Sequence, residues 1–212
     1  KETDSRNAVQ IGVMRRDLQI IVFPCPVNNA PTFAAGNTSF TIPEGTNLCF
    51  AISATDLNGD SIFLSANSPI FDALQTNPPA TITTTSGPGT GNAQFCWPTS
   101  CAQGRASSYQ FTLSAQDNGC PAKTSNVVYT INVLPTTITP ITGPDTVCSS
   151  STTTSLYSVV QEGFPYHWII TGGNQVSGGT TEVAGVQWTS NNGTVSVYAV
   201  NTQNCHSDTS TM

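Results

Sequence analysis

Residues 48–60 read LCFAISATDLNGD, and residues 109–121 read YQFTLSAQDNGCP. In each stretch apolar and polar side chains alternate, which predicts a β-strand with one buried face. Each alternating pattern then ends in a short run of Asp, Asn and Gly, the residue types that form tight turns. The two stretches therefore predict strands that bring side-chain oxygens into the loops at their ends.

The same alternation recurs through the rest of the chain, for example in residues 127–133, 166–170 and 195–199. No segment keeps a helical period over several turns. Short alternating runs separated by Gly, Pro and Asn turns are typical of antiparallel sandwiches. The predicted fold is therefore all-β, with tandem Ig-like antiparallel β-sandwiches.

The pattern divides the chain into three parts. Residues 1–26 contain too few apolar positions to bury a core, so we expect terminal strands of a preceding β-domain. Residues 27–135 contain enough alternating runs for a complete sandwich, and residues 136–212 follow as a second one. The chain is therefore interpreted as a segment of a longer protein.

Composition excludes several functions. Charged residues make up 8% of the chain and the net charge is -6, without any block of Lys or Arg. Nucleic acids and anionic membranes require a cationic face, so neither is an expected partner. No apolar run approaches the roughly 18 residues of a membrane span, which argues against direct membrane insertion. Common catalytic motifs are absent and there are only 2 His, so we predict that the chain is not an enzyme.

Seven cysteines in such a chain favour disulfides and an oxidising compartment. Cys25 and Cys120 are expected at the same end of the central sandwich, and the remaining pairs follow from strand order and exclusion. The preferred pairs are Cys25–Cys120, Cys49–Cys101 and Cys148–Cys205, with Cys96 unpaired. In the alternative, Cys49 pairs with Cys96 across two strands and Cys101 stays free.

Several motifs of the central domain occur in a fixed order: residues 29–33 (NAPTF), 42–46 (IPEGT), 54–60 (ATDLNGD), 95–99 (FCWPT) and 115–121 (AQDNGCP). This order resembles cadherin-like and Ig-like modules of bacterial surface proteins. The C-terminal part resembles a PKD-like domain in residues 143–148 (GPDTVC), 166–173 (YHWIITGG), 186–188 (VQW) and 204–205 (NC).

Together with residues 16–20 (RDLQI), this arrangement is similar to large Bacteroidetes surface proteins of the type IX-secreted, gliding-motility-associated or adhesin type. The resemblance implies an extracellular, cell-surface location and a role as a stiff spacer and adhesive module. Expected partners are neighbouring β-domains of the same longer chain, a cell-surface or polysaccharide ligand, and further copies of the chain. Two alternatives are an accessory spacer or carbohydrate-binding region of an exported hydrolase, and a strand-donating extracellular filament subunit.

The two polar turns also predict a metal site. In a sandwich of this kind the turns lie at the same end, beside the incoming linker. The oxygen-bearing side chains brought together there are Asp56, Asn58, Asp60, Asp117, Asn28 and Asn29. Calcium accepts about six to eight oxygen ligands in irregular geometry, so we expect calcium as the cofactor. In the alternative, Asp and Asn cap their own turns without a metal. Glu44, in another turn, is expected to be solvated.

Overall fold

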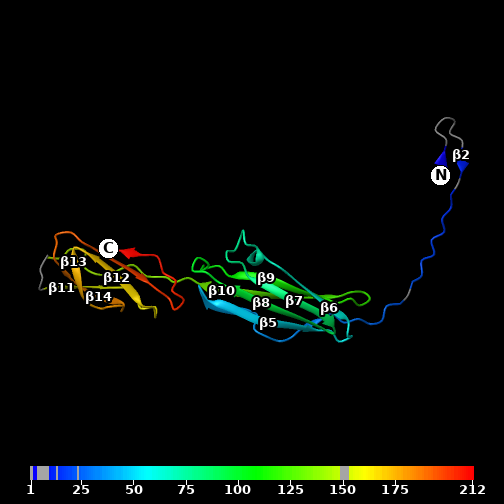
Figure 1. Ribbon diagram of the computed structural model, residues 1–212, viewed down its shortest axis with the longest axis horizontal. Coiled ribbons are helices and arrows are strands. Elements are labelled where there is room, and N and C mark those ends of the chain that lie inside the picture. The colour runs from blue at the N-terminus through cyan, green and yellow to red at the C-terminus, as the bar shows by residue number, and fades with distance from the viewer. Residues whose placement is uncertain (1, 4–9, 13, 23, 149–152) are drawn as a thin grey trace.

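The computed structural model describes residues 2–3, 10–12, 14–22, 24–148 and 153–212 (Figure 1). These residues form strands and one short 3₁₀ helix, η1. The elements are β1 (Glu2–Thr3), β2 (Gln10–Gly12), β3 (Thr32–Phe33), β4 (Ser39–Pro43), β5 (Asn47–Thr55), β6 (Ser61–Asn67), η1 (Pro69–Phe71), β7 (Thr81–Pro88), β8 (Thr90–Pro98), β9 (Tyr109–Gln116), β10 (Thr124–Leu134), β11 (Thr154–Ser158), β12 (Tyr166–Thr171), β13 (Gly173–Ser177), β14 (Val183–Trp188), β15 (Thr194–Ala199) and β16 (Ser210–Thr211).

The central sandwich consists of eight strands in the order β3-β5-β8-β7-β6-β9-β10-β4. Strand β6 connects its two layers, because Ser61 and Ile62 pair with β7 whereas residues 63–67 pair with β9. All neighbouring strands are antiparallel except β10 and β4, which are parallel. This is the all-β, Ig-like sandwich that the sequence predicted.

The core of the central sandwich is aromatic. The rings of Phe95 and Phe111 stack with centroids 4.8 Å apart, and Phe111 stacks in turn on Tyr129 at 4.9 Å. Phe95 comes from β8, whereas the other two come from β9 and β10. The stack therefore joins the two layers, and the alternation in residues 109–115 correctly predicted Phe111 and Leu113 as buried.

A second, separate core lies in the C-terminal part. Two three-stranded sheets, β11-β14-β13 and β12-β15-β16, enclose it. Tyr157 and Trp188 are buried and lie edge to face, and the indole Nε1 of Trp188 donates to the Tyr157 hydroxyl at 3.2 Å. The first core extends from Phe33 to Val133 and the second from Ile138 to Ala199. The predicted domain boundaries, between residues 26 and 27 and between residues 135 and 136, stay predictions.

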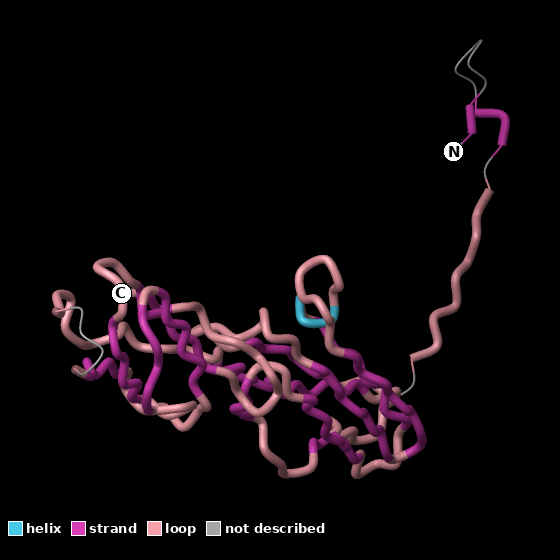
Figure 2. The backbone as a smooth tube through the Cα atoms, turned by 60° about the vertical axis from the view of Figure 1, so that its left-hand side comes forward, coloured by secondary structure: helices cyan, strands magenta, loops and turns pink. Residues whose placement is uncertain are grey.

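The two sandwiches lie end to end, and an extended segment leads away from the central one toward the N-terminus (Figure 1). Near that terminus β1 and β2 pair with each other. The aliphatic side chains of residues 18–22 are exposed, and they form no strand within the described part of the chain. A loop that carries η1 projects from the central sandwich, as the tube in Figure 2 shows.

From β3 onward, charged side chains lie in the loops. Among the strands that the structure describes from β3 to β16, none contains Asp, Glu, Lys or Arg. Both sandwiches therefore have side walls of hydroxyl, amide and apolar groups. The loops at the sandwich ends contain the charged groups, and the candidate sites lie there.

Candidate functional site

The two polar turns and the incoming linker meet at the N-terminal end of the central sandwich. The turn between β5 and β6 contains Asp56, Asn58 and Asp60, and the turn after β9 contains Asp117. Asn28 and Asn29 of the linker contact both turns through hydrogen bonds. All six residues of the predicted metal set therefore lie at one end of the sandwich.

Asp56 organises its own turn. Its Oδ1 accepts hydrogen bonds from the backbone N–H of Asn58 at 2.8 Å and of Asp60 at 3.1 Å. Gly59 has a φ of 82°, a backbone conformation that favours glycine. These contacts form the Asx-type turn of the metal-free alternative, but they use only one of the two carboxylate oxygens of Asp56.

Asp117 connects the second turn to the linker. Its Oδ1 accepts from the backbone N–H of Lys123 at 2.8 Å and of Gly119 at 3.1 Å, and its Oδ2 accepts from Asn28 Nδ2 at 3.0 Å. Burial alone raises the pKa of Asp117. The hydrogen bonds from Lys123, Asn28 and Gly119, together with the Lys123 charge, outweigh that effect and hold the pKa below its usual range. Asp117 is therefore an anion at neutral pH.

The linker is attached to this end by several bonds. Asn58 Oδ1 accepts from the backbone N–H of Asn29 at 2.8 Å and from its Nδ2 at 3.1 Å. Lys123 Nζ donates to the Asn28 carbonyl at 2.6 Å. The predicted disulfide Cys25–Cys120 is confirmed, and it adds a covalent attachment across 95 residues of sequence.

Two buried oxygens in this cluster lack a hydrogen-bond partner among the described residues: Asn28 Oδ1 and Asp56 Oδ2. A buried acceptor left unpaired costs roughly 1–3 kcal/mol, so such atoms indicate a missing partner. A Cβ on Gly119 would contact the Asn28 carboxamide and would lie 2.7 Å from Asp60 Oδ2. The Asn28 and Asp60 side chains therefore converge on Gly119. An all-oxygen donor set of this kind fits a hard cation such as calcium.

The carboxylates alone do not form a metal centre. Within the described residues, no group of three or more His, Cys, Asp or Glu side chains is arranged to hold a metal ion. A cation at this end would therefore depend on amide oxygens, those of Asn28 among them, as well as on carboxylates.

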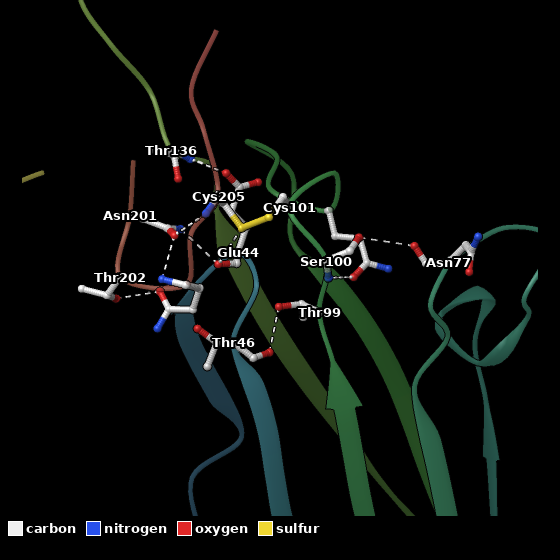
Figure 3. Close-up of a disulfide and its surroundings, with 12 residues drawn as sticks. Glu44, Thr46, Asn77, Thr99, Ser100, Cys101, Thr136, Asn201, Thr202 and Cys205 are labelled. Carbon is white, nitrogen blue, oxygen red and sulfur yellow. Dashed lines mark hydrogen bonds between the residues drawn. A yellow bond between two sulfur atoms is a disulfide. The ribbon is translucent and has the colours of Figure 1, made fainter. Parts of the chain in front are cut away.

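The opposite end of the central sandwich forms the joint to the C-terminal sandwich, and a disulfide crosses this joint. Cys101, in the loop after β8, is bonded to Cys205, which follows β15 in the second sandwich. Figure 3 shows the two sulfur atoms between the two parts of the chain. The predicted pairs Cys49–Cys101 and Cys148–Cys205 are therefore wrong.

Strand register explains the first error. Cys49 and Cys96 lie directly opposite each other on β5 and β8, with Cα atoms 4.2 Å apart, and they form a disulfide. This is the alternative pair that the sequence left open, and Cys96 is not the unpaired cysteine. Cys101 faces the C-terminal sandwich instead. The free cysteine is Cys148, which is exposed.

Glu44 lies at the centre of this joint, and the prediction of a solvated side chain is wrong. Only 3% of its surface is exposed. Its Oε1 accepts from the backbone N–H of Thr136 at 2.8 Å, and its carbonyl accepts from Asn201 Nδ2 at 3.1 Å (Figure 3). Glu44 thus bonds to the linker and to the second sandwich at once.

The loop that carries Cys205 is shaped by Asn201. Its Oδ1 accepts from the backbone N–H of Gln203 and of Cys205, both at 2.9 Å. Gly45 has a φ of 80°, and a Cβ there would lie 2.8 Å from Cys205 Sγ. Close backbone contact, hydrogen bonds and a covalent bond therefore hold the same interface. None of these contacts could be predicted from the sequence, because the residues involved are far apart in the chain.

Comparisons with known proteins give the fold only. No protein-family model matches the chain, and no curated protein matches it in sequence. The chain is similar to the I9-I11 tandem of titin, with 12% identity and a TM-score of 0.49 over 85% of this chain and 64% of that one.

Two further solved structures are similar. One is the EC1-3 fragment of mouse clustered PcdhgC3, with 16% identity and a TM-score of 0.43 over 86% of this chain and 66% of that one. The other is the BIgI domain of the beta protein from S. agalactiae bound to CEACAM1, with 17% identity and a TM-score of 0.36 over 50% of this chain and 97% of that domain.

The disulfides of the chain bear on where the protein is located. Three disulfides in one chain are typical of an extracellular protein. Among the described residues no helix has the length and apolar character needed to cross a membrane. An Ig-like, disulfide-bonded tandem of this kind fits a spacer or an adhesion module.

Proposed function

We propose that this chain is a non-catalytic segment of a large secreted cell-surface protein, acting as a stiff spacer and adhesive module. The observation that carries the proposal is the Cys101–Cys205 disulfide, because it joins two sandwiches that have separate cores. A flexible linker would leave the two sandwiches free to reorient. A disulfide next to the buried Glu44 hydrogen bonds fixes one orientation of the two sandwiches relative to each other. The tandem can then hold its two ends at a set distance and in a set direction.

The sequence motifs support an origin in Bacteroidetes surface proteins, with a PKD-like domain in residues 136–212 and a role in adhesion or gliding. Under this proposal the partners are neighbouring β-domains of the same longer chain and a ligand on a cell or polysaccharide surface. The exposed aliphatic side chains of Leu18, Ile20 and Val22 support a preceding β-domain as one such neighbour, because large exposed apolar patches are rare in folded proteins and mark contact surfaces.

The proposal includes a calcium ion at the N-terminal end of the central sandwich. Asp56, Asp60, Asp117 and Asn28 would hold it, with Asn58 and Asn29 ordering the turn and the linker around it. When bound, calcium would neutralise the carboxylates and provide a partner for the two unpaired oxygens, Asn28 Oδ1 and Asp56 Oδ2. The side chains themselves already attach the linker to the sandwich, so an ion would stiffen an existing joint.

Small-angle X-ray scattering tests the spacer role. The intact chain should give the maximum dimension of two sandwiches in one end-to-end arrangement. The double variant Cys101→Ser/Cys205→Ser should give a broader set of shapes. Cys49→Ser/Cys96→Ser is the matched control, because it also removes one disulfide but leaves the joint closed. Equal scattering from both variants would contradict the proposal.

A further inference from the structure

Arg105 is an isolated cation in a chain of acidic character. After Arg16 the sequence contains only two basic side chains other than histidine, Arg105 and Lys123. Lys123 bonds to the linker at the N-terminal end of the central sandwich. Arg105 lies toward the opposite end, in the loop between β8 and β9, and its backbone N–H donates to Val133 O of β10. Neither the joint nor the oxygen cluster uses the charge of Arg105.

The guanidinium group of Arg105 is held in one position. Its Nε donates to Ser107 O at 2.9 Å and its Nη2 donates to Ser108 O at 3.3 Å. The Cζ atom lies 3.4 Å from the centroid of the Tyr109 ring, and the Tyr109 hydroxyl donates to Gln103 O at 2.9 Å. The aromatic ring therefore covers one face of a guanidinium whose position is already fixed before any ligand binds.

These contacts leave part of the guanidinium available. An arginine side chain has five N–H donors, and the two carbonyls occupy one on Nε and one on Nη2. Three donors, two on Nη1 and one on Nη2, have no partner among the described residues, and the free Nη2 donor forms a parallel pair with one on Nη1. This pair has the spacing that binds both oxygens of a carboxylate at once. The preorganised group is therefore suited to a carboxylate.

Arg105 lines a cavity of about 260 Å³ beside η1. Its other walls are Ser68, Pro69, Ile70, Gln75, Thr76, Tyr109 and Gln110. Pro69 provides the apolar floor, since Ile70 is buried in the core with only 2% of its surface exposed. Gln75 and Gln110 each have a side-chain oxygen with no partner among the described residues. The loop that contains η1 and forms one side of this cavity is the one that projects in Figure 2.

The acidic side chains do not oppose an anion at this cavity. Asp56, Asp60 and Asp117 lie at the other end of the sandwich, and Glu44 is buried in the joint. Glu44 Oε2 would lie 2.6 Å from a Cβ on Gly104, the residue before Arg105, but Glu44 does not line the cavity. Asp72 is the second nearby carboxylate. Its two oxygens already accept from the Leu74 backbone N–H at 2.9 Å and from Gln75 Nε2 at 3.1 Å, within its own loop, and Asp72 does not line the cavity.

We propose that this Arg105 cavity binds the carboxylate of an acidic sugar residue of the hexuronate type. The fixed guanidinium holds the carboxylate, the two glutamine oxygens accept hydrogen bonds from ring hydroxyls, and the apolar floor covers the C–H face of the ring. The volume suits one sugar ring, so a single residue or chain end of an acidic polysaccharide is the expected ligand. This assignment names a ligand class for the adhesive part of the proposed function and does not depend on a rigid joint.

Nuclear magnetic resonance titration of the full chain tests the site with three matched sugars: galacturonic acid, its methyl ester and galactose. Galacturonic acid should shift backbone amides in residues 68–76 and 105–110 at concentrations up to roughly 10 mM, the range of weak single-site binding. The ester and galactose lack the carboxylate, and each should bind at least about tenfold more weakly.

Two variants separate the ligand role of Arg105 from its structural role. Arg105→Gln should lose galacturonate binding, and Arg105→Lys should weaken it about tenfold, because lysine retains the charge but not the paired donors. Lys123→Gln, at the other end, should bind as the parent chain does. The dispersion of amide signals reports whether each variant is folded.

Three outcomes would overturn the proposal. One is the absence of shifts in these segments with galacturonic acid. The second is equal binding of galactose and galacturonic acid. The third is that an acetylated dipeptide with a free carboxylate binds more tightly than galacturonic acid, which would make the cavity a peptide site. Each result is independent of the scattering test, so failure here leaves the spacer role untouched.

Discussion

The side-chain amide of Asn201 donates a hydrogen bond to the backbone carbonyl of Glu44 at 3.1 Å, across 157 residues of sequence. The same Asn201 accepts two backbone N–H groups through its Oδ1, one of them from the disulfide-bonded Cys205. One buried side chain therefore orders the disulfide loop and attaches it to the neighbouring sandwich. The joint is an interface with its own hydrogen-bond network, and the disulfide reinforces it.

Replacement of Asn201 tests this network. Asn201→Ala leaves the Glu44 carbonyl and the backbone N–H groups of Gln203 and Cys205 without their partner, so it should lower the free energy of unfolding by roughly 1–3 kcal/mol. Urea unfolding followed by tryptophan fluorescence measures the change. Thr202→Ala is the control, because Thr202 is exposed and bonds only to the neighbouring Gln203 side chain among the described contacts. An equal loss in both variants would contradict a specific role for Asn201.

Calcium should stabilise the N-terminal end of the central sandwich. EDTA is expected to lower the melting temperature by several degrees, and added calcium should restore it, because ion binding favours the folded state. Asp60→Asn should abolish this response without lowering the melting temperature measured in EDTA, since the Asp60 side chain accepts no hydrogen bond among the described residues.

The matched control for calcium is Asp72→Asn, which makes the same chemical change at the other end of the sandwich. This variant should keep the full response to EDTA. If chelation leaves the melting temperature of the parent chain unchanged, the turns are held by their own Asx hydrogen bonds and the calcium proposal is wrong.

The lowered pKa of Asp117 predicts a loss of stability in acid. The unfolded chain takes up its proton near the ordinary aspartate pKa of about 3.9, whereas the folded chain does so only at lower pH. The stabilisation is therefore complete above the unfolded pKa and is lost as the pH falls through the folded pKa. The urea concentration at the midpoint of unfolding, measured in EDTA to exclude calcium, should therefore decrease as the pH falls over this range.

The Asp117→Asn variant should be less stable than the parent chain at neutral pH, and its stability should fall less steeply than that of the parent chain in acid. A residual slope is expected, because hydrogen bonds from the Leu74 backbone and the Gln75 side chain also lower the pKa of Asp72. An acid slope identical to that of the parent chain would show that Asp117 does not carry this effect.

The cysteine pattern predicts one reactive thiol. All seven cysteines lie in the described part of the chain, and Cys148 is the one outside the three disulfides. Iodoacetamide without denaturant or reductant should therefore modify Cys148 alone, since it is exposed. Peptide mapping by mass spectrometry identifies the modified residue. Alkylation of Cys101 or Cys205 in the native chain would mean that the joint is not covalently closed.

Features that depend on local sequence were predictable. Alternation identified Phe111 and Leu113 as core residues, because side chains on a strand point to opposite faces. The order of strands and turns brought Asp56 and Asp117 to one end, and it also gave the Cys25–Cys120 bond.

Features that depend on register and docking were not predictable. The Cys49–Cys96 bond requires the residue-by-residue alignment of β5 with β8. Glu44 is buried at the joint, where its side chain meets Thr136 of the linker and its carbonyl meets Asn201, so no pattern around residue 44 could indicate its burial. The pairing of Cys101 with Cys205 likewise depends on how two complete sandwiches meet. The Arg105 cavity was missed because Tyr109 and the η1 loop give it its shape.

Residual dipolar couplings test the stiff joint most directly. They report the alignment of each sandwich separately, so two sandwiches in one rigid body must share a single alignment tensor. The intact chain should give one tensor for residues 27–135 and 153–212, and Cys101→Ser/Cys205→Ser should give two tensors of unequal magnitude. Two unequal tensors in the intact chain, with the Cys101–Cys205 bond present, would contradict the account.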